Sequence, residues 1–128
     1  MFPQSAYIKE QGFSSVTENY CEFAELVTGV DMPPDSYEKI AANPDLAYEL
    51  KSRTQDFLAT LPPRERKAVE LSNGLEGQMR SPDEIASEFG NADPKIIKAI
   101  LKKAERKFNK SKRAAELESL GDFLIRLG

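Results

Sequence analysis

Hydrophobic residues along this chain recur every three or four positions, which is the spacing of amphipathic helices, and no stretch shows the two-residue alternation of a strand. The first clear helical pattern runs from Val16 to Thr28 and is followed by Gly29, a residue type that commonly ends helices. Its apolar stripe comprises Tyr20, Phe23, Ala24 and Val27. Its opposite face, predicted to be solvated, carries Glu18, Glu22 and Glu25.

Prolines and capping residues divide the rest of the first half. Met1 to Ser15 mixes aromatic residues with Pro, Gly and Ser and shows no period, so we expect an extended or loosely docked arm. The stiff connector Asp31-Met-Pro-Pro-Asp-Ser36 precedes a short predicted helix that includes Tyr37. Asn43 is a natural N-cap with a proline after it, which predicts a helix from Pro44 to about Ala59.

Three further helices are predicted in the second half. The first spans Arg64 to Ser72 and is ended by Gly74. The segment Ser81-Pro-Asp-Glu84 has the pattern of a capping box and opens a short helix that stops at Gly90. Asp93-Pro94 repeats the cap-then-proline signal and opens a long helix to about Asn109. Two helices joined by a tight turn that contains glycine form a helix-turn-helix arrangement.

The predicted fold class is therefore all-α. A small acidic helical module of unassigned role, residues 1–59, precedes a helix-turn-helix domain, residues 60–128. The length of 128 residues and the 40% hydrophobic content fit one ordinary domain or two small helical units. The net charge of −3 hides a segregation: residues 91–113 hold nine cations and two acids, net +7, and the remainder carries −10.

Composition excludes several kinds of chemistry. The chain has no histidine and a single cysteine, Cys21, which we interpret as a small buried hydrophobe and which cannot form an intramolecular disulfide. It has no glycine-rich phosphate loop, Ser/His/Asp set or nucleophile elbow, so no catalytic residue, metal site or cofactor is expected, and the protein is not expected to be an enzyme. Without a secretory leader or a membrane-length apolar run, a cytoplasmic location and no membrane partner are expected.

The long helix beginning at Pro94 has two different faces. Five apolar residues share one side, namely Ile97, Ile100, Leu101, Ala104 and Phe108. The other side carries Lys95, Lys98, Lys102 and Arg106. The pattern predicts that the apolar side packs on preceding helices, with Phe89 and Phe108 in the core, while the basic side faces phosphates or a major groove. Lysine-rich outer faces also serve solubility, so charge alone leaves both interpretations open.

Several short motifs in the second half resemble, in order and spacing, the fourth region of the bacterial primary sigma factor family. They are Leu61-Pro-Pro-Arg-Glu-Arg66, Leu71, Gly74-Leu75, Ser81-Pro-Asp-Glu-Ile85, Glu88-Phe89-Gly90 and Lys103-Ala104-Glu-Arg-Lys-Phe108. The resemblance covers about Leu61 to Leu124, half of the chain. It implies a four-helix unit whose helix-turn-helix reads the upstream promoter element and whose surface docks on the flap of the RNA polymerase β subunit.

The resemblance also implies roles for individual residues. DNA contacts would come from Lys95, Lys98, Lys102 and Arg106. Arg64 and Arg66 would touch phosphate where the first helix crosses the backbone, or are simply exposed residues of a first helical turn. Contact with polymerase would come from Val69, Leu71 and Leu75. Core packing is the alternative for Leu71, whereas Leu75 follows a helix-ending glycine and is expected to be exposed.

The chain departs from the family at the positions that read bases. Lys98, Ala99 and Leu101 stand where the family usually carries Arg, Gln and Glu, and the turn before the recognition helix is one residue longer. Alanine and leucine cannot form the bidentate hydrogen bonds that distinguish base edges, so weak sequence discrimination is expected. Nothing before Leu61 resembles the promoter-melting region of the family.

Three hypotheses follow from these patterns. The first is a transcription-associated DNA-binding protein or sigma-like accessory factor, with the acidic half as a docking or inhibitory module. The second is an adaptor that binds RNA polymerase or another protein through a sigma-like fold without specific DNA contact. The third is an inert helical interaction domain. The patterns leave the oligomeric state open.

Overall fold

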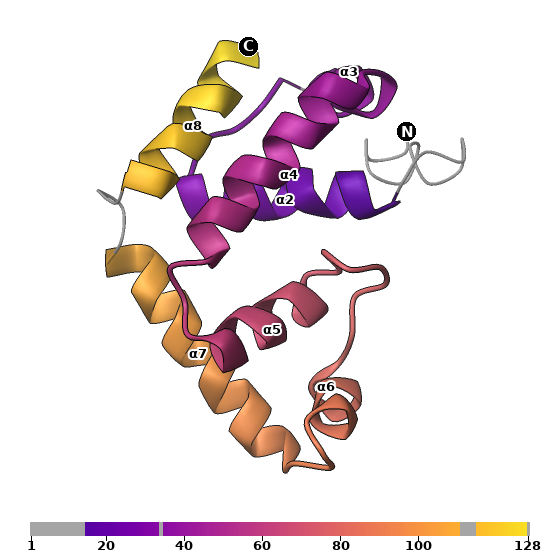
Figure 1. The fold of residues 1–128 in the computed structure, drawn as a ribbon, viewed down its shortest axis with the longest axis vertical. Coiled ribbons are helices and arrows are strands. Elements are labelled where there is room, and N and C mark those ends of the chain that lie inside the picture. The colour runs from indigo at the N-terminus through magenta and orange to yellow at the C-terminus, as the bar shows by residue number, and fades with distance from the viewer. Residues whose placement is uncertain (1–14, 34, 111–114, 128) are drawn as a thin grey trace.

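A computed structural model describes residues 15–33, 35–110 and 115–127, which form seven helices and no strand (Figure 1). The prediction of an all-α protein is confirmed, while the predicted N-terminal arm lies almost wholly outside the described residues. The helices are α2 (Ser15–Thr28), α3 (Ser36–Ala42), α4 (Pro44–Leu58), α5 (Pro63–Ser72), α6 (Pro82–Glu88), α7 (Pro94–Lys110) and α8 (Ala115–Leu127). None of these helices is long and apolar enough to cross a membrane.

Local capping signals determine where the helices begin and end. Asn43 Oδ1 accepts hydrogen bonds from the backbone N–H groups of Asp45 (3.0 Å) and Leu46 (3.4 Å) at the start of α4. The capping box at the start of α6 is present as predicted. Gly29 and Gly74, which follow α2 and α5, both have positive φ angles, a conformation that glycine adopts readily. These short-range features explain why the sequence located the helices well.

The last helix packs on the first half of the chain. In Figure 1, α8 lies beside α4 and α2, whereas α5, α6 and α7 form the other end of the molecule. Arg53 of α4 fixes this contact, because its Nη1 donates to the carbonyl oxygen (2.9 Å) and the hydroxyl (2.6 Å) of Ser119 on α8. Helix α8 belongs to the predicted 60–128 domain by sequence and packs against the predicted 1–59 module.

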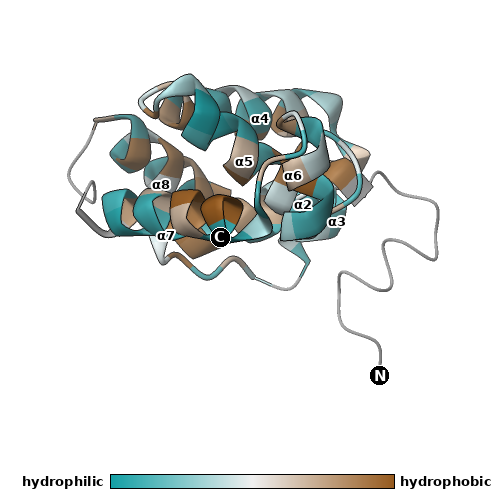
Figure 2. Ribbon diagram, turned by 90° about the horizontal axis from the view of Figure 1, so that it is seen from below, coloured by the Kyte–Doolittle hydropathy of each residue, from teal (hydrophilic) through white to brown (hydrophobic). Residues whose placement is uncertain are grey.

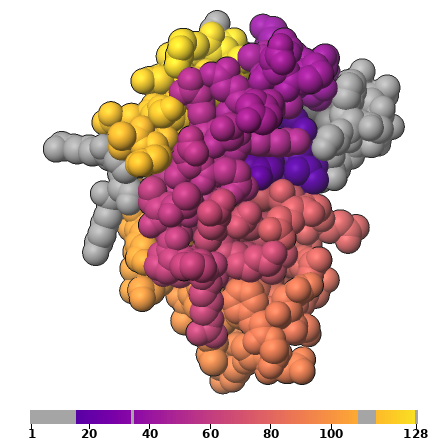
Figure 3. Space-filling view, in the orientation of Figure 1, coloured from indigo at the N-terminus to yellow at the C-terminus, as the bar shows by residue number. Residues whose placement is uncertain are grey.

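The main hydrophobic core draws on both halves. Hydrophobic and hydrophilic residues are interleaved along the helices (Figure 2), so each helix can contribute an apolar face to a shared interior. Phe23 and Leu50 from the first half, Ala104 of α7 and Leu120 of α8 belong to one buried cluster. In the space-filling view the two ends of the molecule are in contact across the visible face (Figure 3). A smaller cluster holds α5, α6 and α7 together through Leu71, Ile85, Ala86 and Ile97.

The start of α2 is more enclosed than the sequence predicts. Residues 17–21 are all buried, and Glu18 is only 1% exposed, so the prediction that Glu18 lies on a solvated face is wrong. The neighbouring residue Asn19 is covered by the turn that follows α5, where its Nδ2 donates to the carbonyl oxygens of Gly74 (3.0 Å) and Gly77 (3.3 Å). Helical periodicity identifies one buried face and cannot reveal a second one covered by a distant turn.

Candidate nucleic-acid interface

Helix α7 is held in one orientation from both of its ends. Ile97, near its start, is fully buried in the smaller cluster. Phe108, near its end, lies edge-on to Phe23 with 5.9 Å between ring centroids and 5.4 Å from the ring of Phe57. The helix therefore cannot rotate about its axis without breaking both clusters, and the predicted apolar face of α7 is confirmed.

The side of α7 away from the core is strongly basic. We define the basic face as the exposed residues Lys95, Lys98, Lys102, Lys103 and Arg106. Within the described part of the chain, none of these five side chains forms an ion pair or hydrogen bond with another side chain. Lys107 differs, because its Nζ lies 2.6 Å from Oε2 of the buried Glu65. Lys103 was not among the predicted contact residues, although its place in the basic run of the sequence signals it.

At the corner between α6 and α7, local hydrogen bonds cap α6 at its start and α7 after the turn that joins the two helices. Ser81 Oγ accepts from the backbone N–H of Glu84 (3.3 Å), and Glu84 Oε1 accepts from that of Ser81 (3.1 Å). The hydrogen bond from the Ser81 backbone lowers the pKa of Glu84. In the turn that follows, Gly90 and Asn91 have φ angles of 76° and 62°, two consecutive left-handed residues. Asp93 Oδ1 then caps α7 by accepting from the backbone N–H of Lys95 at 2.9 Å.

Arg64 extends the positive surface toward this corner. It is exposed in the first turn of α5, and its guanidinium carbon lies 5.9 Å from the ring centroid of Phe89. Phe89 is partly buried and packs against the smaller cluster. The aromatic contact orients Arg64 without neutralising its charge, so this residue remains able to contact a phosphate.

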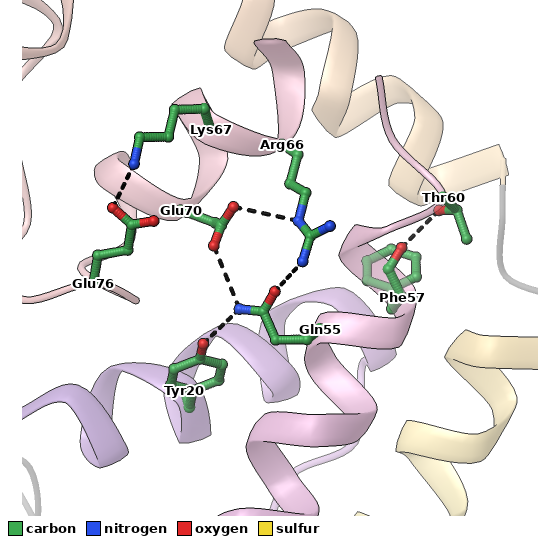
Figure 4. A network of polar contacts seen from close by, with 8 residues as sticks. All are labelled: Tyr20, Gln55, Phe57, Thr60, Arg66, Lys67, Glu70 and Glu76. Atoms are coloured by element: carbon green, nitrogen blue, oxygen red, sulfur yellow. Dashed lines mark hydrogen bonds and ion pairs between the residues drawn. The ribbon is translucent and has the colours of Figure 1, made fainter. Parts of the chain in front are cut away.

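Arg66, for which phosphate contact stays a prediction, has a different environment, because its guanidinium group is engaged within the protein. It is only partly exposed, its Nη2 donates to Oε1 of Gln55, and its Nε lies 3.4 Å from Oε1 of Glu70 (Figure 4). Gln55 Nε2 in turn donates to the hydroxyl of Tyr20 at 2.6 Å. Arg66 therefore connects α5 to α4 and α2. The Arg66–Glu70 spacing of four residues is the sequence signal for part of this network.

The proposed polymerase-contacting residues are inside the protein. Val69, Leu71 and Leu75 are all buried, and the prediction that Leu75 is exposed is wrong, since its exposed fraction is 3%. The backbone N–H of Leu75 donates to the carbonyl oxygen of Glu70 (2.9 Å), and that of Gly74 donates to Leu71 (3.4 Å). This pair of bonds is the Schellman motif, which folds the residue after the glycine back onto its helix. A leucine directly after a helix-ending glycine is the signal that predicts such burial.

The remaining chemistry of the chain is sparse. Among the described residues, no group of three acidic, histidine or cysteine side chains is placed to hold a metal ion. Cys21 is fully buried, which confirms its interpretation as a small core residue. The basic face, the α6–α7 corner and Arg64 therefore form the main candidate interface. Comparison of the chain with protein-family models, with curated proteins and with solved structures finds no match.

Proposed function

We propose that this chain is a transcription-associated protein that binds duplex DNA through the basic face of α7. The observation that carries the proposal is the set of five exposed cations on a helix whose other side is locked in the core. Solubility is served by surface charges of both signs, whereas α7 carries Glu105 as its single acid. A concentrated cationic surface attracts the phosphates of nucleic acids.

Phosphate contacts would supply most of the binding free energy. Each lysine or arginine that neutralises a phosphate releases condensed counterions, so affinity falls as salt is added. The exposed Ile96 and Ala99 of α7 offer only apolar contacts, such as those made with a thymine methyl group. Leu101 is partly buried against both clusters and is turned away from the basic face. We therefore expect weak discrimination among DNA sequences.

The resemblance of residues 61–124 to the fourth region of primary sigma factors supports this assignment. In that comparison α6 and α7 correspond to the helix-turn-helix and α7 to its recognition helix. The proposed role is that of a DNA-binding regulator or sigma-like accessory factor. Arg64, held above Phe89, would contact the phosphate backbone beside the groove that α7 enters.

The salt dependence of DNA binding tests the proposal. Fluorescence anisotropy of a short labelled duplex, titrated with the full chain over a series of salt concentrations, gives the slope of log Kd against log salt. Substituting Lys98→Ala together with Lys102→Ala should weaken binding at low salt and reduce the slope by about two units, because each phosphate contact contributes ~0.9. Unrelated duplex sequences should bind with similar Kd values.

A matched control changes the same net charge elsewhere. Lys39 and Lys51 lie on α3 and α4, where Lys39 pairs with Asp35 and Lys51 lies over the ring of Tyr20. The combined change Lys39→Ala and Lys51→Ala should leave the slope unchanged. Absence of wild-type binding at low salt, or equal effects of the two double variants, would contradict DNA binding through α7.

A further inference from the structure

Leu26 of α2 lines three neighbouring hollows in the surface. We call these three hollows together the Leu26 groove. The first, about 220 Å³, lies between α2, α5 and α7, and the second, about 420 Å³, lies between α2 and α8. The third, about 330 Å³, lies between α2 and the segment from Asp31 to Tyr37. Leu26 lines all three and is 71% exposed, which is unusual for a leucine on a helix that is otherwise well buried.

Apolar side chains from three helices line the first two hollows of the Leu26 groove. Phe23, Leu26 and Val27 lie on consecutive turns of α2. Leu101 and Phe108 extend the floor onto α7, and on the side of α8 it is extended by Leu117 and by Ile125, which is 62% exposed. Exposed apolar side chains beside such hollows are typical of sites that receive the apolar face of another helix.

The rim of the Leu26 groove is acidic. Six carboxylates line the three hollows: Glu22, Glu25, Asp31, Glu105, Glu118 and Asp122. Of the described residues, no lysine or arginine lines any of them. Charges of one sign around a low-dielectric floor concentrate the electrostatic field there, so the complementary ligand carries lysine or arginine beside its apolar side chains.

Gly121 of α8 contributes to the openness of the second hollow. Glycine is a poor helix former, yet it lies within α8 and lines the second hollow. A Cβ atom at this position would lie 3.9 Å from side-chain atoms of Thr28, an ordinary contact, so packing among the described residues does not require glycine. The absent side chain keeps the hollow between α2 and α8 open.

We propose that the Leu26 groove binds a basic amphipathic helix of a partner protein. Apolar residues on one face of that helix would cover Leu26 and Ile125, and flanking lysines or arginines would face the six carboxylates. A second copy of this chain fits less well, because a twofold dimer through the groove would bring two acidic rims together. The inference concerns a surface other than the basic face and does not depend on DNA binding.

A model peptide tests the groove. The probe is a short labelled helical peptide with leucines on one face and lysines on the other, and its counterpart has glutamates in place of the lysines. The full chain should bind the lysine peptide at least about tenfold more tightly, and Leu26→Ser should weaken that binding about tenfold. Tyr48→Ser is the matched control, since Tyr48 is 75% exposed beside Asp45, Glu49 and Asp56 in a different hollow. It should leave binding unchanged.

A second variant separates binding from stability. Gly121→Ala should raise Tm by about 3 °C, because alanine favours the helix. It should also weaken binding of the lysine peptide about threefold, because the added methyl group narrows the hollow. A stabilised variant that binds less tightly cannot be explained by unfolding. Equal binding of the two peptides, or equal losses from Leu26→Ser and Tyr48→Ser, would overturn the proposal. So would a Leu26-dependent dimer, seen by sedimentation velocity, that excludes the peptide.

Discussion

At the scale of single residues, burial determines the chemistry of the one thiol. Burial is the larger cause and the nearby carboxylates of Glu25, Glu18 and Glu22 the smaller one of a shift that raises the pKa of Cys21 to about 12. The thiolate is the reactive form, so the folded thiol should react with a chromogenic disulfide reagent about 10³-fold more slowly than the unfolded chain at mildly alkaline pH. Absorbance of the released thiol, followed with and without guanidinium, measures both rates.

The same shift in pKa has a consequence for stability. The folded state holds the Cys21 proton more tightly than the unfolded state. The free energy of unfolding therefore falls as the pH rises from 9.0, the ordinary pKa of the thiol, toward about 12, its pKa in the folded protein. Cys21→Ala removes this dependence, and the stability of the wild type relative to the variant should decline across that window. In the thiol-reactivity experiment, a fast reaction of the folded protein with the disulfide reagent would contradict the burial of Cys21.

Gly74 occupies a position where any other residue should lower the stability of the fold. Its φ angle is +69°, and a Cβ atom there would collide with Nδ2 of Asn19 and lie 2.9 Å from the carbonyl oxygen of Gly77. Gly74→Ala should lower the free energy of unfolding by about 2–4 kcal/mol, from left-handed strain and the broken Asn19 contacts. Urea denaturation followed by circular dichroism measures the change.

Gly90→Ala is the control for the backbone contribution alone. Gly90 has a φ angle of +76° in open space, so alanine there should cost only the left-handed strain of about 1 kcal/mol. Equal losses at positions 74 and 90 would mean that the contact between α2 and the turn after α5 contributes nothing to the fold.

At the scale of helices, the sequence predicts what short-range chemistry determines. The caps at Asn43 and Ser81 act within three residues, and their helices begin where the sequence indicates. The two faces of α7 follow from periodicity alone, so the candidate interface was largely predictable. The predictions fail where distant parts of the chain meet. Arg66 bonds to Gln55, eleven positions earlier, and Glu18 is buried although periodicity assigns it to the solvated face.

Helix pairing was the least predictable feature of the fold. Amphipathic patterns state which face of a helix is buried but not which partner covers it. The apolar face of α8 could have packed on α7, its neighbour in sequence, and packs instead on α4 and α2. The Leu26 groove was missed for the same reason, since α2, α7 and α8 have to be brought together before it exists.

At the scale of the whole molecule, the shared core predicts that α2, α4, α7 and α8 unfold together. Leu120 of α8 is fully buried in the cluster that also contains Ala104 of α7. Leu120→Ala should therefore lower the free energy of unfolding by about 2–5 kcal/mol, because a large apolar side chain is removed from a packed interior. Hydrogen exchange should show the loss of protection in α7 as well as in α8.

The outcome distinguishes one cooperative unit from two. Ile125→Ala removes a comparable apolar side chain from the same helix at an exposed position, so it should change the stability by less than about 0.5 kcal/mol. If Leu120→Ala lowers protection in α2, α4 and α7 equally, the basic face is held in place by the acidic half of the chain. A fragment that begins at residue 60 would then lack the helices α2 and α4 that hold the basic face in place. If α7 keeps its protection in Leu120→Ala, residues 60–110 form an independent unit, close to the division that the sequence predicts.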